Sequence, residues 1–383
     1  MTKFLLIFGT RPEAIKMAPL VHSLIKYANS NPKKLSVKVC ITAQHRQLLD
    51  QVLDVFEIEP HYDLDIMQDN QDLFHLSSRI LLKVKEVLND FEPDLVFVHG
   101  DTSTSFVAAL ASFYKQIKVA HVEAGLRTND IYSPWPEEAN RQLTSRLTDF
   151  HFAPTLNSKN NLIAENIFEK DIFITGNTVI DALLFAQNKI KKDHELQEKI
   201  ENEINLDFRV KGSKYILVTG HRRENFGKSF VNICKALKDI ASLNKEFKII
   251  YPMHMNPNVV EPVTEMLGSV DNIYLIKPLE YLSFVFLMDN SYLILTDSGG
   301  IQEEAPSLGK PVLVMRENTE RPEAIEHGTV ELVGTNRHKI AEKVQELIDN
   351  EQKYLNMSEA NNPFGDGTAS EKILEILINN YEL

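Results

Sequence analysis

The sequence predicts an α/β protein of two domains, each built on a doubly wound parallel sheet. Three observations support this prediction. The chain has 383 residues, which suggests two hydrophobic cores rather than one. Short apolar runs alternate with helical patterns through both halves, as repeated strand–helix units require. A charged run over residues 189–203 lies between the halves and indicates a solvated helix and connector.

The predicted strands of the first half are short and apolar, as in a sheet that is buried on both faces. They cover residues 4–8, 37–42, 95–98, 119–122, 150–153 and 171–175. Helical patterns lie between them, at residues 44–56, 73–88, 103–114 and 137–147, and a further helix that begins after Gly176 continues into the charged run. The turn after the first strand contains Pro12 and Glu13, which suit the first turn of a helix.

The second half repeats this alternation, with predicted strands over residues 215–219, 248–251, 272–276, 292–296, 311–315 and 330–333. A last helix covers residues 369–380. We therefore expect a first domain over residues 1–185 and a second domain over residues 186–365. Residues 366–383 form a C-terminal helix that can pack back on the first domain.

The composition argues against several classes of protein. The net charge is −13, with acidic and basic residues interspersed, so nucleic acid and anionic membranes are not expected as main partners. Cys40 and Cys234 stand in apolar surroundings and predict buried free thiols in a reducing cytoplasm, without a disulfide or a metal site. No segment has the length of a membrane span, and the first apolar run is a strand rather than a signal peptide.

A glycine-rich turn at residues 297–300 (Asp-Ser-Gly-Gly) follows the predicted strand over residues 292–296. Adjacent glycines let the backbone approach a ligand closely. A helix that begins near Gly300 would point free N–H groups at the same place and would bind an anion. Glu304 lies just beyond, where it suits sugar hydroxyls, and an anion joined to a diol indicates a nucleotide. A plain strand-to-helix turn is the alternative.

Ligands of doubly wound sheets bind beyond the carboxyl ends of the strands, so the residues after each strand are candidates for a site. In the first half these are Arg11, Lys16, Gln44, His45, Asp101, Glu123 and Glu137. In the second half they are His221, Arg222, His254, Asn256, Arg316, Arg321 and the glycine-rich turn. Facing each other across a cleft, the two sets would place an anion pocket opposite acid–base groups.

Most of these candidates also have a purely structural explanation. The alternatives are an Arg11–Glu13 pair, an exposed Lys16, a helix cap at Asp101, and pairs of Glu123 and Glu137 with Arg127 and Arg141. Two nucleotide motifs are absent, because no G-x-G-x-x-G follows the first strand and no G-x-x-x-x-G-K-[ST] occurs. The sequence therefore argues against a tightly held NAD and against NTP hydrolysis, and no cofactor is expected.

Several sequence motifs follow one another between the first strand and about Gly334. They are residues 9–19 (GTRPEAIKMAP), 99–102 (HGDT), 121–128 (HVEAGLRT), 134–141 (PWPEEANR), 220–225 (GHRREN), 298–309 (SGGIQEEAPSLG) and 320–324 (ERPEA). In these segments the chain resembles the non-hydrolysing bacterial UDP-N-acetylglucosamine 2-epimerases. The resemblance implies a glycosyltransferase-B-like pair of Rossmann-like domains with the active site in the cleft. It also implies interconversion of UDP-N-acetylglucosamine and UDP-N-acetylmannosamine without an added cofactor, and a homodimer that supplies precursors of surface polysaccharides.

The resemblance further implies roles for individual residues. Asp101, Glu123, Glu137 and His221 match the family's catalytic positions, with Lys16 beside them. Ser298, Gly299, Gly300 and Arg11 would contact the diphosphate, Glu304 the ribose and Phe284 the uracil. The position of Arg321 before a predicted helix suggests a phosphate contact as well. A second UDP-N-acetylglucosamine, bound as an allosteric activator, would contact Gln44, His45, Gln47, Gln71, Arg222 and His254.

The chemistry of the reaction supports this assignment. The C2–H group of the sugar has no adjacent carbonyl to acidify it, so inversion requires oxidation by NAD or loss of UDP to give a glycal. The NAD motif is missing. The second route needs a base, a proton donor and cations for the diphosphate, and the carboxylates, His221, Arg11 and Lys16 form such a set. A hydrolysing 2-epimerase, a glycosyltransferase and a nucleotide-sugar sensor are the alternatives.

Overall fold

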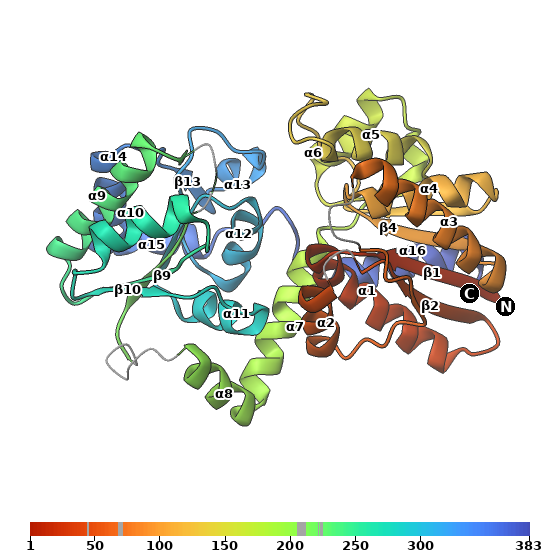
Figure 1. The fold of residues 1–383 in the computed structure, drawn as a ribbon, viewed down its shortest axis with the longest axis horizontal. Coiled ribbons are helices and arrows are strands. Elements are labelled where there is room, and N and C mark those ends of the chain that lie inside the picture. The colour runs from red at the N-terminus through yellow and green to blue at the C-terminus, as the bar shows by residue number, and fades with distance from the viewer. Residues whose placement is uncertain (44–45, 68–71, 205–211, 221, 223–224) are drawn as a thin grey trace. The chain divides into compact units, whose positions relative to one another are not determined.

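The computed structural model describes residues 1–43, 46–67, 72–204, 212–220, 222 and 225–383. The chain divides into two compact units (Figure 1). Unit 1 contains residues 1–182 and 364–383, and unit 2 contains residues 183–363. The domain limits expected at residues 185 and 365 stay predictions.

Unit 1 contains a seven-stranded parallel sheet in the order β3-β2-β1-β4-β5-β6-β7. Its strands are β1 (Thr2–Phe8), β2 (Leu35–Ile41), β3 (Tyr62–Asp63), β4 (Leu95–His99), β5 (Lys118–Val122), β6 (Phe150–Ala153) and β7 (Ile172–Ile174). Its helices are α1 (Arg11–Ser30), α2 (Arg46–Val55), α3 (Leu73–Phe91), α4 (Ser103–Tyr114), α5 (Glu137–Arg146), α6 (Leu156–Ala164), the start of α7 (Thr178–Lys192) and α16 (Ala369–Tyr381). The predicted doubly wound parallel sheet is confirmed. β3 was not predicted, because two residues carry no periodic pattern.

Both faces of β1 are buried, which explains its unbroken apolar sequence. Leu5 and Ile7 point to one face and pack with residues of α3 and α4, such as Val84 and Val107. Phe4 points to the other face, where its ring meets that of Tyr381 in α16 at a centroid distance of 5.2 Å. The period of two along the strand therefore assigns each side chain to one of two helical layers.

Unit 2 contains a six-stranded parallel sheet in the order β10-β9-β8-β11-β12-β13. Its strands are β8 (Tyr215–Thr219), β9 (Lys248–Pro252), β10 (Ile273–Ile276), β11 (Leu293–Thr296), β12 (Val312–Val314) and β13 (Val330–Leu332). Its helices are α8 (His194–Ile204), α9 (Lys228–Leu243), α10 (Pro257–Leu267), α11 (Tyr281–Asn290), α12 (Gly299–Glu304), α13 (Pro322–Glu326), α14 (Arg337–Asp349) and α15 (Glu351–Ser358). The alternation predicted for the second half is confirmed.

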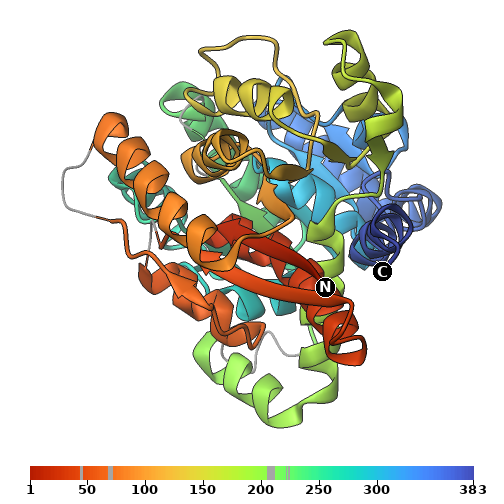
Figure 2. The ribbon, with the colours of Figure 1, turned by 90° about the vertical axis from the view of Figure 1, so that its right-hand side faces the viewer.

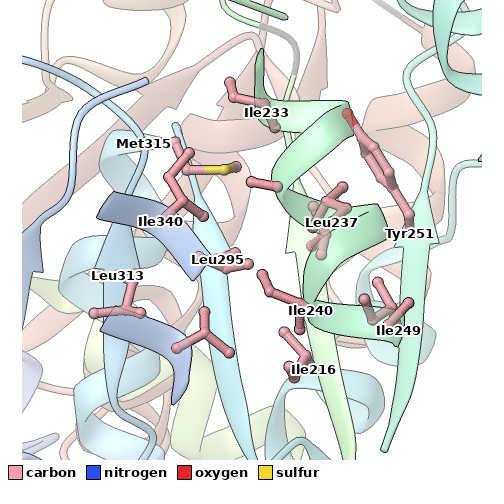
Figure 3. Close-up of a cluster of buried hydrophobic side chains, with 14 of the residues drawn as sticks. Ile216, Ile233, Leu237, Ile240, Ile249, Tyr251, Leu295, Leu313, Met315 and Ile340 are labelled. Atoms are coloured by element: carbon pink, nitrogen blue, oxygen red, sulfur yellow. The ribbon is translucent and has the colours of Figure 1, made fainter. Parts of the chain in front are cut away.

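The core of unit 2 lies between one face of its sheet and the helices that cover it. Leu237 and Ile240 of α9 pack against Ile216 of β8 and Leu295 of β11, and Ile340 of α14 extends the same cluster (Figure 3). These five side chains are at most 1% exposed. This packing holds the strands rigidly and so fixes the loops at their carboxyl ends.

The charged run between the halves is not one helix, as the sequence pattern suggested. α7 ends at Lys192 and α8 begins at His194. Asp193 separates them, and its carboxylate accepts a hydrogen bond from the backbone N–H of Leu196 at 3.0 Å. An aspartate in this position caps a new helix, which competes with continuation of the preceding one.

The C-terminal helix α16 packs on α1 in unit 1, so the last residues of the chain complete the unit that the first residues begin. The two chain ends are drawn close together in both views (Figures 1 and 2). The carboxylate of Asp181 accepts from the backbone N–H groups of Ala369 at 3.2 Å and Ser370 at 2.8 Å, which anchors the start of α16.

Two expectations from composition can be compared with the described part of the chain. Cys40 and Cys234 are both buried and free, as predicted. Among the described residues, no helix is both long enough and apolar enough to cross a membrane.

Candidate active site

The two sheets each have one position where the strand order reverses. In unit 1 this position lies between β1 and β4, and in unit 2 between β8 and β11. At such a position the loops after the two strands diverge at the carboxyl edge of the sheet and leave room for a ligand. These loops carry many of the residues that the sequence singled out.

Glu13 joins the two loops at the reversal in unit 1. One carboxylate oxygen accepts from the backbone N–H groups of Gly9 at 3.1 Å and Thr10 at 2.8 Å. The other accepts from the hydroxyls of Thr102 at 2.7 Å and Ser105 at 3.0 Å. Burial raises the pKa of Glu13, although these hydrogen bonds oppose the change. Glu13 therefore ties the loop after β1 to the loop after β4, a role that the predicted pair with Arg11 did not anticipate.

Glu123 follows β5 with a left-handed φ of 63°, an uncommon conformation for a glutamate. Its buried carboxylate forms an ion pair with Lys16 of α1 and accepts a hydrogen bond from the Asn177 side chain at 2.8 Å. Burial acts to raise the pKa of Glu123, but Lys16, the neighbouring His99 and the hydrogen bonds outweigh it, and the pKa is lowered. Glu123 is therefore ionised in this structure. The alternatives of an exposed Lys16 and a Glu123–Arg127 pair are wrong, since Arg127 pairs with Glu165 at 2.6 Å.

Asp101 forms an ion pair with Arg141 of α5, and its backbone carbonyl accepts from the Asn140 side chain at 2.9 Å. It does not cap α4, because the N-cap is Thr102, whose hydroxyl accepts from the backbone N–H of Ser105. The alternative of an ion pair between Glu137 and Arg141 is also wrong. Arg141 binds Asp101 and Glu138, the latter at 3.1 Å, while Glu137 lies half-buried in the first turn of α5.

Three buried histidines lie behind these loops, on the adjacent strands β4, β5 and β6. Burial lowers the pKa of His99 to about 4 and those of His121 and His151 to about 3, so all three are neutral near pH 7. A ring nitrogen of His121 lies 2.7 Å from the carbonyl oxygen of Gly100 and supports the loop that carries Asp101. His151 is 1% exposed.

In unit 2, the predicted helix start lies at Gly299, directly after β11 and Ser298. A Cβ atom at Gly299 would come within 2.9 Å of the Arg321 guanidinium, and one at Gly300 would lie 3.2 Å from the carboxylate of Glu304. Arg321 is held by Glu303 through an Nε–Oε1 contact of 2.8 Å. The structure therefore brings Ser298, Gly299, Gly300, Glu304 and Arg321 together. The guanidinium of Arg321 lies against the backbone of Gly299, which has no side chain.

Asp297 anchors the loop after β8. It is fully buried, and its carboxylate accepts from the backbone N–H of Arg222 at 2.8 Å and from the Asn225 side chain at 3.2 Å. The hydroxyl of Tyr251 donates to the carbonyl oxygen of Gly220 at 2.9 Å. The described ends of the loop that contains His221 are thus attached to the sheet.

The remaining predicted site residues lie partly outside the described part of the chain. His221, Gln44, His45 and Gln71 lie outside the described residues, as does the side chain of Gln47. Arg222 lies 3.8 Å from Glu320, His254 is exposed, and Phe284 is half-buried in α11. Within the described ranges, no group of three or more His, Cys, Asp or Glu residues could hold a metal ion.

Sequence reasoning missed four residues that organise the candidate site, namely Glu13, Arg141, Asn177 and Asp297. Three of them were present in segments already singled out, but their partners are far away in the sequence. Asn177 lies 54 positions from Glu123, and Asp297 lies 75 positions from Arg222. The signal that the sequence offered was a polar residue directly after a predicted strand or at a predicted helix start.

One parallel sheet carries carboxylates at its strand ends, and the other carries a glycine-rich turn with an arginine against it. This combination is typical of α/β enzymes that act on nucleotide sugars. A family model described as UDP-N-acetylglucosamine 2-epimerase matches residues 28–378. The chain belongs to this family.

Individual relatives agree with the family model over nearly the whole chain. The UDP-N-acetylglucosamine 2-epimerase of Escherichia coli (strain K12) is 57% identical over 378 residues, which are 99% of each chain. The crystal structure of the Neisseria meningitidis enzyme bound to UDP-GlcNAc has a TM-score of 0.89 and 51% identity, over 99% of this chain and all of that one. A Methanocaldococcus jannaschii enzyme in complex with UDP-GlcNAc and UDP has a TM-score of 0.79 and 35% identity, over 99% of this chain and 100% of that one.

Proposed function

We propose that this 2-epimerase converts UDP-N-acetylglucosamine and UDP-N-acetylmannosamine into each other by eliminating UDP and adding it back, without net hydrolysis. The observation that carries the proposal is the buried, ionised Glu123 held beside Lys16 after β5. A carboxylate in this state can accept a proton, as removal of C2–H requires. The bound UDP-GlcNAc in the Neisseria meningitidis structure supports the choice of substrate.

The proposed reaction has two halves that mirror each other. A base removes the proton from C2, the electron pair of that bond forms the C1–C2 double bond, and UDP leaves from C1 with the electrons of the C–O bond. The glycal then accepts a proton at C2 on the opposite face, and an oxygen of UDP attacks C1. No atom is gained or lost, so no oxidant, water or metal ion enters the balance.

Unit 1 supplies the acid–base groups in this proposal. Glu123 and Glu137 would lie close to the C2 proton transfers, Asp101 would support one of them, and His221, which follows β8 in the sequence of unit 2, would assist them. Lys16 neutralises charge and controls the basicity of Glu123, because the ion pair between them favours the carboxylate form. When Lys16 contacts a phosphate instead, the pKa of Glu123 rises and the carboxylate becomes a stronger base.

Unit 2 supplies the groups that hold UDP. Arg321, already oriented by Glu303, would contact the diphosphate where Ser298, Gly299 and Gly300 expose their backbone. Arg11 would neutralise the same diphosphate, Glu304 would bind the ribose hydroxyls, and Phe284 would pack by the uracil. These groups would keep UDP bound after the C–O bond breaks, so that it can be added back.

The decisive experiment is incubation of the protein with UDP-N-acetylglucosamine in deuterated water, followed by NMR. We expect both UDP-sugars to accumulate, with deuterium at C2. Free N-acetylmannosamine as the main product would show hydrolysis instead, and absence of an epimer without an added acceptor would favour a transferase.

We also propose a second UDP-N-acetylglucosamine site, which activates the enzyme, and a homodimeric assembly. The activating site is supported by the complex of the Methanocaldococcus jannaschii enzyme with both UDP-GlcNAc and UDP. The homodimer is supported by the apolar side chains of Leu82 and Phe113, which are exposed on α3 and α4. Purified UDP-N-acetylmannosamine should then react only after trace UDP-N-acetylglucosamine is added, and light scattering should give twice the 43.7 kDa chain mass. Immediate turnover would refute the activation.

A further inference from the structure

Asn177 lies at the start of α7 and makes contacts in three directions. Its side-chain Oδ1 accepts from the backbone N–H of Val179 at 3.1 Å, and its Nδ2 donates to the carboxylate of Glu123 at 2.8 Å. Its backbone N–H donates to the carbonyl oxygen of Phe364 at 2.7 Å. The residue is 2% exposed, so these partners replace water.

The amide of Asn177 cannot be turned over without losing both side-chain contacts. Its oxygen faces a backbone donor and its nitrogen faces a carboxylate, so the reverse orientation would place like groups together. Aspartate at this position would keep the acceptor for Val179 but would present a second carboxylate to Glu123. The donor to Glu123 is therefore a specific property of asparagine here.

Two segments that lead between the units meet at this residue. The chain leaves unit 1 after residue 182 and returns at residue 364. Gly176 and Gly365 lie backbone to backbone, since a Cβ atom at Gly176 would be 3.2 Å from the Phe364 carbonyl oxygen and 3.4 Å from the Gly365 Cα. Their φ values of 88° and 127° favour glycine at both positions.

Several charged and titratable groups surround Glu123 besides Asn177. Lys16 reaches it from α1, and His99 and His121 lie near it on β4 and β5. Lys16 is part of the proposed catalytic set, while His99 and His121 are buried within the sheet. Asn177 also contacts the returning segment, through Phe364.

From this geometry we propose that Asn177 is a positioning residue, which holds the Glu123 carboxylate and makes its placement depend on the paired segments 176–177 and 364–365. The inference rests on the proposed function, because Glu123 matters here as the base for C2–H. Displacement of either segment would move the Asn177 amide and, with it, the hydrogen bond to Glu123. Correct seating of the two segments is thus a condition for an aligned base.

Asn177→Asp and Asn177→Ser in the full-length protein test the contact with Glu123. Both retain an acceptor for the α7 backbone, and neither retains the amide N–H that donates to Glu123. We expect kcat for C2 deuterium exchange at pH 7 to fall at least tenfold in both variants. In Asn177→Asp the acidic limb of the kcat/KM profile should also move up by about one pH unit or more, because a second carboxylate disfavours ionisation. UDP affinity in calorimetry should stay within twofold.

Asn336→Asp serves as the matched control, since Asn336 caps the exposed start of α14 in unit 2. For the second part of the proposal, Gly365→Ala should lower kcat at least threefold with unchanged UDP affinity, whereas Gly367→Ala should not. Gly367 also has a positive φ, 84°, in the same segment, but the close approach to Gly176 is made by Gly365.

A kcat and pH profile equal to those of the wild-type protein in both Asn177 variants would overturn the positioning role, whatever their thermal stability. Equal effects of the two glycine substitutions would overturn the link to the paired segments. Absence of C2 exchange in the wild-type protein itself would instead refute the proposed function, so the two failures are distinguishable.

Discussion

Glu123 shows how the surroundings of one residue set its chemical state. Burial alone would favour the neutral acid, yet the ion pair with Lys16 and the hydrogen bond from Asn177 favour the carboxylate. The same carboxylate without Lys16 would have a higher pKa and would be a stronger base. In this structure Glu123 is therefore ionised but a weak base, and its basicity depends on the ion pair with Lys16.

Replacement of Glu123 by Gln should lower the rate of C2 deuterium exchange at least ~100-fold, while UDP affinity in calorimetry stays within about threefold of the wild-type value. The amide keeps the size of the side chain but cannot accept the proton. Glu169→Gln is the matched control, because Glu169 pairs with Lys159 on an exposed surface. Retained exchange in Glu123→Gln would remove this residue from the proton transfer.

Arg321 should contribute to binding of the diphosphate, and its partner Glu303 must be considered in the test. Removing the arginine alone would take the Nε donor away from Glu303, a carboxylate that is only 1% exposed. We expect the double variant Arg321→Ala/Glu303→Gln to bind UDP about 10- to 100-fold more weakly than Glu303→Gln alone, as loss of a charge-assisted hydrogen bond would give. Equal affinities in calorimetry would show that Arg321 does not contact UDP.

At the scale of elements, buried side chains on or next to the sheets hold the loops at the strand ends. Glu13 of α1 joins the loops after β1 and β4, His121 of β5 supports the loop after β4, and Asp297 anchors the loop after β8. Glu13, His121 and Asp297 are buried, so the positions of the candidate catalytic groups depend on the integrity of the sheets. This arrangement provides the rigid support that precise proton transfer requires.

The buried histidines of β4, β5 and β6 predict how stability depends on pH. Their pKa values in the folded protein lie near 3 to 4, below the usual 6.5, so the unfolded chain binds more protons between these values. Stability is therefore fully present above pH 6.5 and is lost as the pH falls, by about 1.4 kcal/mol per pH unit for each histidine.

The urea midpoint of His151→Gln should accordingly fall less between pH 6.5 and pH 5 than that of the wild-type protein. His194→Gln is the control, because His194 is exposed and should follow the wild-type curve. Parallel curves for His151→Gln and the wild type would contradict the assignment of His151 as a neutral buried group.

At the scale of the molecule, unit 1 is discontinuous in sequence. Residues 364–383 return to it after the whole of unit 2 and cover α1 with α16. Ile373 and Leu377 of α16 are fully buried, and the ring of Tyr381 contacts Phe4 and Phe150. The last helix is therefore a structural part of the first unit.

Leu377→Ala should destabilise unit 1 by about 2–5 kcal/mol, the usual effect of a cavity in a packed core. Hydrogen exchange measured by mass spectrometry should become faster in β1 and β4, with no change in β8 and β11. Glu375→Ala, on the exposed side of the same helix, should leave both units unchanged. Equal acceleration in both units would show that they unfold together.

Features that depend on local interactions were predictable from the sequence, and features that depend on contacts between distant segments were not. Strand and helix positions were predictable because they follow from local patterns, as in β8 and α4, whose limits were predicted without error. The glycine turn at residues 297–300 was predictable for the same reason. The alternative ion pairs of Glu123 with Arg127 and of Glu137 with Arg141 are wrong, because the nearest opposite charge in the sequence was not the nearest in space.

The sequence by itself determined the two alternating α/β halves, the family, and the residues that stand at the strand ends. These features depend on residue type, periodicity and order, which a linear chain contains in full. Only the tertiary structure decided which charges meet, that Glu123 is ionised beside Lys16 and Asn177, and that α16 completes unit 1. The physical reason is that burial and pairing arise when segments distant in sequence pack together, and both set the charge state of a side chain.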